Sequence, residues 1–476
     1  MKGLSVMASQ ISNDPAFMPI SALSQAIQSG ALSPVDLMAR FLARIGAYDE
    51  KLHAFVCFYE DDARMAAEAA DKAIRAGHSV GPLHGIPIAI KDIVDMEGRV
   101  TTGGSKVWID RVSPVTATLV ERLIAAGMIV IGKTHSVEFA MGGWGTNQHM
   151  GTPWNPWDLA THRTPGGSSA GSGVSVAAGL APCAIGTDTG GSVRLPASWC
   201  GLTGLKTTIG RVSVHGVLPL SNTLDTPGPM TRTVEDAALL YNVLAGPDPK
   251  DPLTLRHPVT DPLPEMRKGV AGLRLAVMPE TERNGVDPEM LAAYDDSIET
   301  LRELGAQITT LALPYPFRKL GAATGQIIGA EGYFFVGDVV DQMDLPVDDA
   351  VRPRIWIGKD MSARDYQRAL KAQQDIKASF DDALVDVDAL LTPTTATPAI
   401  PVDAVDQNDT PAMFTRVANL LERCALSLPN GFTAGGLPTS LQIVCRGYDE
   451  AMALRIGWAY EQATNWTGRA PMGLED

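Results

Sequence analysis

Several kinds of functional site are excluded by residues that this sequence lacks. Its five cysteines are widely spread, form no CxxC pair and share no zinc-type spacing with histidine. We therefore expect reduced cysteines in the core of a cytosolic protein, and neither a metal nor a cofactor. No stretch approaches the roughly 18 consecutive apolar residues of a membrane span, and residues 3–8 are too short and too weakly apolar for a signal peptide. These absences predict a cytoplasmic protein with no membrane partner.

Positive charge is scarce as well. The 476 residues include 39 lysines and arginines against 54 acidic residues, which gives a net charge of −15 at pH 7. Because lysine and arginine dominate binding to phosphate, this balance predicts no nucleic-acid partner. The chain is long enough to bury a large hydrophobic core, and its 45% of hydrophobic residues is ordinary for a globular protein.

Helical and strand patterns alternate along the chain. Apolar runs at residues 86–90 and 183–187 predict short buried strands, while Ser33 followed by Pro34 predicts the start of a helix. This alternation predicts an α/β fold, in which helices cover both faces of a sheet. Residues 247–264 contain six prolines and little apolar periodicity, which predicts a linker.

Two familiar motifs match in letters only. Residues 127–134 fit the Walker A phosphate loop, but the middle positions are Met-Ile-Val-Ile, which favours a buried strand over a curled loop. Residues 167–171 fit the G-x-S-x-G elbow with Ser169 as the nucleophile. That elbow requires a preceding strand and a later acid and histidine, whereas residues 161–165 show no strand pattern and no histidine follows His257. We therefore expect neither a nucleotide site nor an α/β-hydrolase.

Two segments rich in glycine and serine, residues 165–172 and 186–194, follow a strand pattern that ends on Lys91. A serine hydroxyl attacks well only when a base takes its proton, and a lysine can be that base only when it is neutral. Burial lowers the pKa of a lysine, and the end of an apolar strand is a suitable place for such burial. The alternative is an exposed lysine at the end of a strand.

Consecutive glycines precede Ser192. In the Gly-Gly-Ser sequence of residues 190–192, backbone N–H groups can converge on one point, as an oxyanion hole requires. The alternative is a glycine turn between a strand and a helix, with Ser192 as the helix cap. These residues alone leave a catalytic site and a structural turn equally open.

The region from His84 to Arg211 resembles the amidase signature family over the whole diagnostic length of that family. The resemblance is carried by residues 84–92, 132–134, 138–142, 155–158, 165–169, 186–194 and 201–206, and later by 390–394 and 436–438. It implies an α/β amidase signature fold, with a large mixed β-sheet core flanked by layers of α-helices. It also implies a single domain over residues 1–476, with a signature core at 84–212, a linker at 247–264, and a second half, 265–476, that completes the sheet and walls the substrate pocket.

The same resemblance implies roles for individual residues. Ser192 would be the acyl-forming nucleophile, Ser168 a bridging serine preceded by a cis peptide bond, and Lys91 the neutral base. Protons would pass from Ser192 through Ser168 to Lys91 and return to the leaving amine, and water would then release the acid from the acyl-enzyme. The oxyanion hole would consist of the N–H groups of Thr189, Gly190, Gly191 and Ser192. Structural support would come from Ser169, Asp188 and Arg194.

Substrate-binding residues are predicted on two segments. Met141, Gly142 and Trp144 lie near the catalytic loops, and residues 324–335 end in a Tyr-Phe-Phe run. Trp144 and this run would line an apolar or aromatic acyl pocket, the alternative being that they are core aromatics. The predicted substrate is a small aryl or alkyl carboxamide, or a related hydrazide or carbamate.

These observations predict a free-standing amidase, a hydrolase of carbon–nitrogen bonds other than peptide bonds. Its partners would be a small-molecule amide, water and, by default, a second copy in a homodimer. Residues 194–196 and 224–227 favour this interpretation. The alternative is the A subunit of a glutamyl-tRNA(Gln) or aspartyl-tRNA(Asn) amidotransferase, which releases ammonia from glutamine, because residues 139–142 and 231–236 resemble that protein too. A non-catalytic scaffold is disfavoured because all three triad positions are intact.

Overall fold

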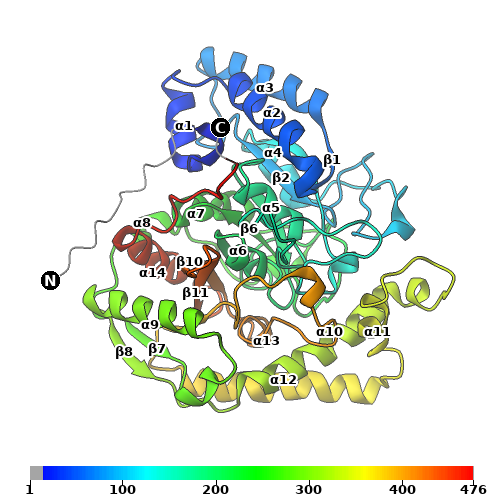
Figure 1. The fold of residues 1–476 in the computed structure, drawn as a ribbon, viewed down its shortest axis with the longest axis vertical. Coiled ribbons are helices and arrows are strands. Elements are labelled where there is room, and N and C mark those ends of the chain that lie inside the picture. Colours follow the sequence, from blue (N-terminus) through cyan, green and yellow to red (C-terminus); the bar gives the residue numbers. More distant parts are fainter. Residues whose placement is uncertain (1–13, 475–476) are drawn as a thin grey trace.

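A mixed sheet of eleven strands lies at the centre of the structure, a computed structural model that describes residues 14–474 (Figure 1). Residues 3–8, considered above for a signal peptide, lie outside the described residues. The strand order is β1-β3-β2-β4-β6-β5-β10-β11-β9-β7-β8. The strands are β1 Phe55–Phe58, β2 Pro87–Lys91, β3 Ile129–Thr134, β4 Ala184–Asp188, β5 Thr203–Lys206, β6 Thr226–Thr231, β7 Arg274–Val277, β8 Gln307–Thr310, β9 Ala389–Pro393, β10 Ala425–Phe432 and β11 Pro438–Cys445.

Helices accompany this sheet along the whole described chain. The α-helices are α1 Ile20–Gln28, α2 Pro34–Leu52, α3 Glu60–Arg75, α4 Thr118–Ala125, α5 Ala170–Ala177, α6 Arg194–Trp199, α7 Val234–Leu244, α8 Leu263–Met266, α9 Pro288–Glu303, α10 Phe317–Val340, α11 Val351–Trp356, α12 Ala363–Ala383, α13 Arg416–Leu420 and α14 Glu450–Ala463. Short 3-10 helices lie at Pro15–Phe17, Lys106–Trp108, Glu138–Ala140, Pro252–Leu255, Glu280–Arg283 and Val402–Ala404. In Figure 1, α2 and α3 lie at one end of the molecule and α10 and α12 at the other. Across residues 14–474, no helix combines the length and the hydropathy that crossing a membrane takes.

Both parallel and antiparallel pairs occur in the sheet. β2 runs parallel to β3 and β4, and β7 runs parallel to β8 and β9. The other neighbours pair antiparallel, as β5 does with β6 and β10. The predicted α/β fold with a large mixed sheet is thereby confirmed.

The two faces of the sheet bury different clusters of side chains. In β2, Ile88 and Ile90 join a cluster that includes residues of α4 and α7, whereas Ala89 joins a cluster with residues of α2, α3 and α5. Because successive side chains of a strand point to opposite faces, helices cover the sheet on both sides. All five residues of β2 are buried, so Lys91 ends its strand in the interior.

Local signals in the sequence account for the beginning of α2 and for the structure of β3. Ser33 Oγ accepts a hydrogen bond from the N–H of Val35 at 3.0 Å, and Pro34 occupies the first helical position. Residues 127–134, which match Walker A in letters, lie mostly in the fully buried strand β3. This segment is therefore a strand and not a phosphate loop.

The two halves of the chain interleave in the sheet. β10, from the second half, pairs antiparallel with β5 from the first half. The proline-rich residues 247–264 cross between the halves and are held against the first half. There, Asp248 accepts hydrogen bonds from Thr118 Oγ1 at 2.7 Å and from Ser213 Oγ at 2.6 Å. A continuous sheet therefore runs through both halves of the chain.

Candidate active site

Lys91, the last residue of β2, is fully buried beside two hydroxyl groups. Its Nζ lies 2.7 Å from Ser168 Oγ and 2.8 Å from Thr187 Oγ1. Burial lowers the pKa of Lys91 to about 7, against the opposing effect of the Asp225 and Asp188 carboxylates. A substantial fraction of Lys91 is therefore neutral near pH 7 and can accept a proton.

Ser168 lies in the loop that leads into α5, and the Gly167–Ser168 peptide bond is cis. The next residue, Ser169, ties this loop to β4, because its Oγ accepts a hydrogen bond from the N–H of Thr187 at 3.2 Å. A Cβ at Gly186 would lie 2.7 Å from Ser169 Oγ, so the close approach of the two segments requires glycine there. Ser169 thus holds the loop that carries Ser168 against the strand.

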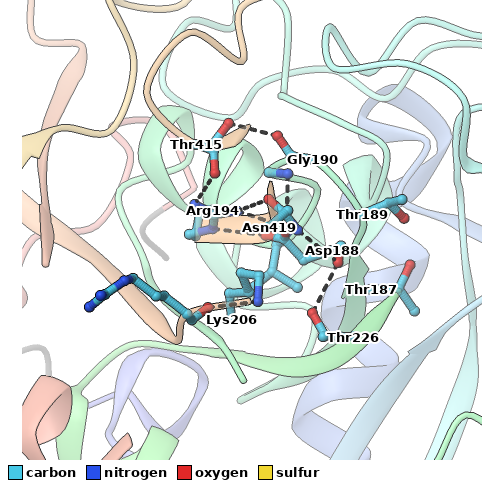
Figure 2. A network of polar contacts seen from close by, with 12 residues as sticks. Thr187, Asp188, Thr189, Gly190, Arg194, Lys206, Thr226, Thr415 and Asn419 are labelled. Atoms are coloured by element: carbon cyan, nitrogen blue, oxygen red, sulfur yellow. Dashed lines mark hydrogen bonds and ion pairs between the residues drawn. The ribbon is translucent and has the colours of Figure 1, made fainter. Parts of the chain in front are cut away.

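Asp188 and Arg194 form a fully buried ion pair beneath the loop that contains Ser192 (Figure 2). The Asp188 carboxylate accepts the N–H of Gly191 at 2.8 Å and the N–H of Val193 at 3.2 Å. It also accepts Arg194 Nη2 at 2.8 Å and Nε at 3.0 Å. Burial alone would raise the pKa of Asp188, but the Arg194 guanidinium holds it at about 2. The charged pair therefore fixes the backbone on both sides of Ser192.

The last third of the chain completes this support. Arg194 Nη1 donates to the Thr415 carbonyl at 2.7 Å and to Gln442 Oε1 at 2.6 Å, and Nη2 donates to Asn419 Oδ1 at 2.7 Å. Thr415 Oγ1 donates in turn to the carbonyl of Gly190 at 2.8 Å (Figure 2). Residues from α13 and β11 thus hold the glycine loop from the other side.

Ser192 lines a cavity and is 7% exposed. The loops of the two serines touch, because the N–H of Ser169 reaches the Ser192 carbonyl at 3.4 Å. Among the described residues, no hydrogen bond joins the hydroxyls of Ser168 and Ser192. The structure therefore brings Lys91 and Ser168 into direct contact and places Ser192 on the adjoining loop.

The four N–H groups predicted for an oxyanion hole differ in availability. That of Gly191 is directed to the Asp188 carboxylate. Those of Thr189, Gly190 and Ser192 donate to no group within residues 14–474. Three of the four predicted donors therefore have no acceptor among the described residues.

The cavity at Ser192 has a volume of about 230 Å³. Met141 and Gly142, both predicted to bind substrate, line it. Gly325 and Ile328 of α10 form another part of its wall. The second half of the chain thus supplies part of the cavity wall at Ser192.

The aromatic residues predicted to line the pocket lie elsewhere. Trp144 stacks on Trp199 with ring centroids 5.5 Å apart, and its Nε1 donates to the Asp409 carbonyl at 3.1 Å. Residues 333–335 border a separate hollow of about 690 Å³, where Phe334 is 77% exposed. The structure does not bring these side chains to Ser192, because α10 presents glycine and an aliphatic side chain to the Ser192 cavity.

Asp225 is a site residue that the sequence patterns did not single out. Its carboxylate accepts hydrogen bonds from Thr189 Oγ1 and from the N–H groups of Leu220 and Ser221 at 2.8 and 2.9 Å. Burial raises the pKa of Asp225 to about 6. This residue connects the glycine loop to a cavity-lining turn and adds negative charge near Lys91.

Two arginines of the site were also missed, Arg354 of α11 and Arg416 of α13. Both line the Ser192 cavity, together with the exposed Asp409. In the sequence they stand in segments without a motif, and only the fold brings them to the nucleophile. Thr187, by contrast, could be found from its place at the end of a strand inside the glycine-rich motif. Residues 14–474 contain no group of three or more His, Cys, Asp or Glu that could hold a metal ion.

Known relatives correct the predicted function. The chain is 39% identical to the A subunit of the glutamyl-tRNA(Gln) amidotransferase of Chloroflexus aggregans, over 96% of this chain and 98% of that protein. The prediction of a free-standing amidase is therefore wrong, and the alternative is better supported. Residues 194–196 and 224–227 favoured that prediction, but in the structure Arg194 donates to the Asp188 carboxylate and Asp225 accepts the N–H of Leu220.

The predicted partners need the same correction. The predicted partners were a small amide and water, with no nucleic acid. This prediction disagrees with relatives that are named as one subunit of a tRNA enzyme. The net charge of −15 was overinterpreted, since it bears only on direct contact with phosphate and not on membership of a complex.

Solved structures and a family model agree on the family. The chain matches the A subunit of the glutamyl-tRNA(Gln) amidotransferase of Thermotoga maritima with a TM-score of 0.81 at 31% identity, covering 97% of this chain and 98% of that one. It matches the peptide amidase of Stenotrophomonas maltophilia with a TM-score of 0.86 at 29% identity, covering 96% and 99%. The family model described as Amidase matches residues 36–454. This chain therefore belongs to the amidase signature family and is a hydrolase of carbon–nitrogen bonds other than peptide bonds.

Proposed function

We propose that the chain is the A subunit of a glutamyl-tRNA(Gln) amidotransferase and releases ammonia from glutamine. The observation that carries this proposal is the 39% identity to a protein of that name over nearly the whole of both chains. The buried Lys91–Ser168 contact beside Ser192 supports the amide chemistry that this function needs.

The reaction follows from the positions of three side chains. Ser192 Oγ attacks the carboxamide carbon of glutamine and forms a C–O bond, while its proton passes through Ser168 to neutral Lys91. Collapse of the tetrahedral intermediate breaks the C–N bond, and the proton returns to the leaving nitrogen as ammonia departs. Water then attacks the acyl-enzyme with Lys91 as the base, the ester bond breaks, and glutamate leaves. The 2.7 Å distance from Lys91 Nζ to Ser168 Oγ supports this path.

The negative charge of both tetrahedral intermediates falls on the former carbonyl oxygen. The N–H groups of Thr189, Gly190 and Ser192 are the proposed donors, since they have no other acceptor within residues 14–474. The Asp188–Arg194 pair and Ser169 act on this oxygen indirectly, by holding the loops that carry the donors.

The proposal extends to the organisation of the protein. Ammonia would pass to a partner subunit that works on glutamyl-tRNA, in the cytoplasm, where charged tRNA is used. We also propose that residues 1–476 act as a single domain with the boundaries expected above, because one sheet takes strands from both halves of the chain.

Ammonia release from glutamine tests the proposal. The chain is assayed alone and with the partner subunits of its own organism, with the Ser192→Ala variant as the matched blank. We expect Ser192-dependent hydrolysis of glutamine, and conversion of glutamyl-tRNA to glutaminyl-tRNA only when the partners are present. Turnover of simple aryl or alkyl amides with no hydrolysis of glutamine in either setting would contradict the proposal.

A further inference from the structure

We infer that Arg416, assisted by Arg354, forms a subsite that binds a carboxylate of the substrate in the Ser192 cavity. The inference deepens the proposed function and rests on it, because glutamine carries a carboxylate at the end opposite its carboxamide. It assigns the recognition of that end to Arg416 of α13, a residue that no motif of the sequence marks.

Arg416 lies against the loop that carries the nucleophile. A Cβ built on Gly190 would lie 3.5 Å from Arg416 Cγ and 3.7 Å from its Nε. Gly321 and Gly325 of α10 face the same side chain, since a Cβ on either would lie within 3.9 Å of an Arg416 atom. Three glycines, from α10 and from the loop, thus lie beside this arginine.

Arg416 is half-buried at the wall of the Ser192 cavity, and its guanidinium keeps unused donor capacity. Nη1 donates to the Gly321 carbonyl at 2.8 Å, but the buried Nε has no hydrogen-bond partner among the described residues. A buried N–H without an acceptor is costly, and a ligand oxygen is the kind of group that would remove this cost. This unpaired Nε is the observation that points to an acceptor-bearing ligand.

Arg354 adds a second positive charge to the same cavity. Its guanidinium is held by neutral acceptors only, namely the Met141 carbonyl at 3.2 Å and the carbonyl and Oε1 of Gln407 at 2.6 and 2.8 Å. Neither Arg354 nor Arg416 makes an ion pair within residues 14–474. Burial and the neighbouring Arg354 lower the pKa of Arg416 to about 10, against the opposing effect of Asp409, so Arg416 remains cationic at neutral pH.

Both arginines line one cavity, and the carboxylates that act on them, Asp409 on Arg416 and Asp348 on Arg354, form no ion pair with either among the described residues, which favours an anionic ligand there. Guanidinium groups match the geometry of a carboxylate, which accepts two parallel hydrogen bonds. The exposed Asp409 lines the same cavity and provides an opposite charge where an ammonium group could bind. The charges of the cavity therefore suit an amide whose far end carries a carboxylate, with or without a neighbouring amine.

Two amides separate the contributions of these charges. Glutaramate retains the carboxylate of glutamine and lacks its amine, whereas 4-aminobutyramide retains the amine and lacks the carboxylate. We expect kcat/KM for glutaramate to exceed that for 4-aminobutyramide by about 10- to 100-fold, the range for a hydrogen bond to a charged group. In Arg416→Gln this ratio should fall toward one, mainly because KM for glutaramate rises. Arg416→Lys should restore part of the preference for glutaramate.

Binding without turnover provides a second measurement. In the Ser192→Ala protein, calorimetry with glutarate should show binding that Arg416→Gln weakens by about 10- to 100-fold. The matched control is Arg64→Gln, which removes an exposed arginine paired with Glu60, and thermal unfolding confirms that each variant is folded. A ratio or an affinity that Arg416→Gln leaves unchanged would overturn the subsite.

The outcomes separate this inference from the proposed function. If glutaramate is hydrolysed in an Arg416-dependent manner and glutamine is not, the subsite stands and the proposed function fails. If glutamine is hydrolysed and Arg416→Gln lowers kcat/KM equally for glutamine, glutaramate and 4-aminobutyramide, the proposed function stands and the subsite fails.

Discussion

Arg194 and Arg416 both lie against the glycine loop of residues 188–194, but their surroundings differ. Arg194 is fully buried, and Nε, Nη1 and Nη2 all donate to acceptors that include the Asp188 carboxylate. Arg416 donates from Nη1 to a carbonyl of α10, and its Nε has no partner among the described residues. The region around Arg194 is complete without a ligand, whereas the region around Arg416 is not. The polar groups around Arg194 thus hold the backbone, whereas the unsatisfied Nε of Arg416 belongs to a residue of the cavity wall, where we infer a ligand.

Removing Arg194 disrupts the fully hydrogen-bonded region around it. This substitution should lower stability and turnover more than those that follow. Arg194→Met leaves the Asp188 carboxylate buried without its cation, which typically costs about 3–5 kcal/mol of stability. We expect urea unfolding to show that loss, and turnover to disappear because the Ser192 loop loses its anchor. The matched control is Arg64→Met, which removes an exposed ion pair with Glu60 and should change stability by at most about 1 kcal/mol. Equal stability of the two variants would contradict the role given to Arg194.

Two buried lysines at the ends of neighbouring strands extend the comparison of Arg194 with Arg416 to the proposed base. Lys91 of β2 faces hydroxyl groups, whereas Lys133 of β3 lies 3.7 Å from the carboxylate of Asp92. We expect Lys91→Met to lower kcat by about 10²- to 10⁴-fold, the range for removal of a general base, with stability largely retained. Lys133→Met should instead destabilise the fold, because it leaves Asp92 unpaired, while the molecules that fold keep their turnover. Near-normal kcat in a folded Lys91→Met protein would contradict the proposed base.

Asp225 allows a smaller and more specific test. Lys91 acts as a base only when neutral, so turnover should rise with pH as Lys91 loses its proton at about 7. The charged groups that raise the pKa of Lys91 are the Asp225 and Asp188 carboxylates. Asp225→Asn removes one of them, so the pKa of Lys91 falls and the rise in turnover should move to lower pH, by about one unit. The pH profile of kcat/KM measures this shift.

The control for that measurement is Asp251→Asn. Asp251 accepts the N–H groups of Val214 and Leu253 and is not among the charges that act on Lys91. Its replacement should leave the pH of the rise where it is. A shift of the profile toward higher pH in Asp225→Asn would reverse the sign expected here and refute this electrostatic role.

The sequence allowed prediction of the elements with simple periodic patterns, and it failed where a strand contains residues typical of turns. Buried strands such as β2 and β4 are short apolar runs with clear ends. β6, with the sequence Thr-Pro-Gly-Pro-Met-Thr, has the composition of a loop and becomes a strand because β4 and β5 lie on either side of it. In β10 the register shifts between Pro429 and Gly431, which accommodates the proline within the sheet. Only the neighbouring strands reveal these two elements.

The same limit applied to the site. Lys91, Ser168 and Ser192 stand in motifs, so their positions were predictable. Trp144 was assigned to the pocket as an aromatic near the catalytic loops. In the structure it stacks on Trp199, which lies 55 positions later in the chain. Arg416 meets the nucleophile loop only because α10 and α13 pack together. Contacts between distant segments decide which side chains face the substrate, and periodicity carries no information about them.

The interleaved sheet has a consequence for the timing of synthesis. The serine nucleophile is translated at position 192, but the acceptors that hold Arg194 include Asn419 and Gln442. At about 5–20 residues per second, the ribosome needs on the order of 10–50 s to reach them. A nascent chain therefore carries Ser192 long before the residues that anchor its loop have been synthesised. We expect fragments truncated before β11 to lack turnover, because they lack Gln442 and its hydrogen bond with Arg194.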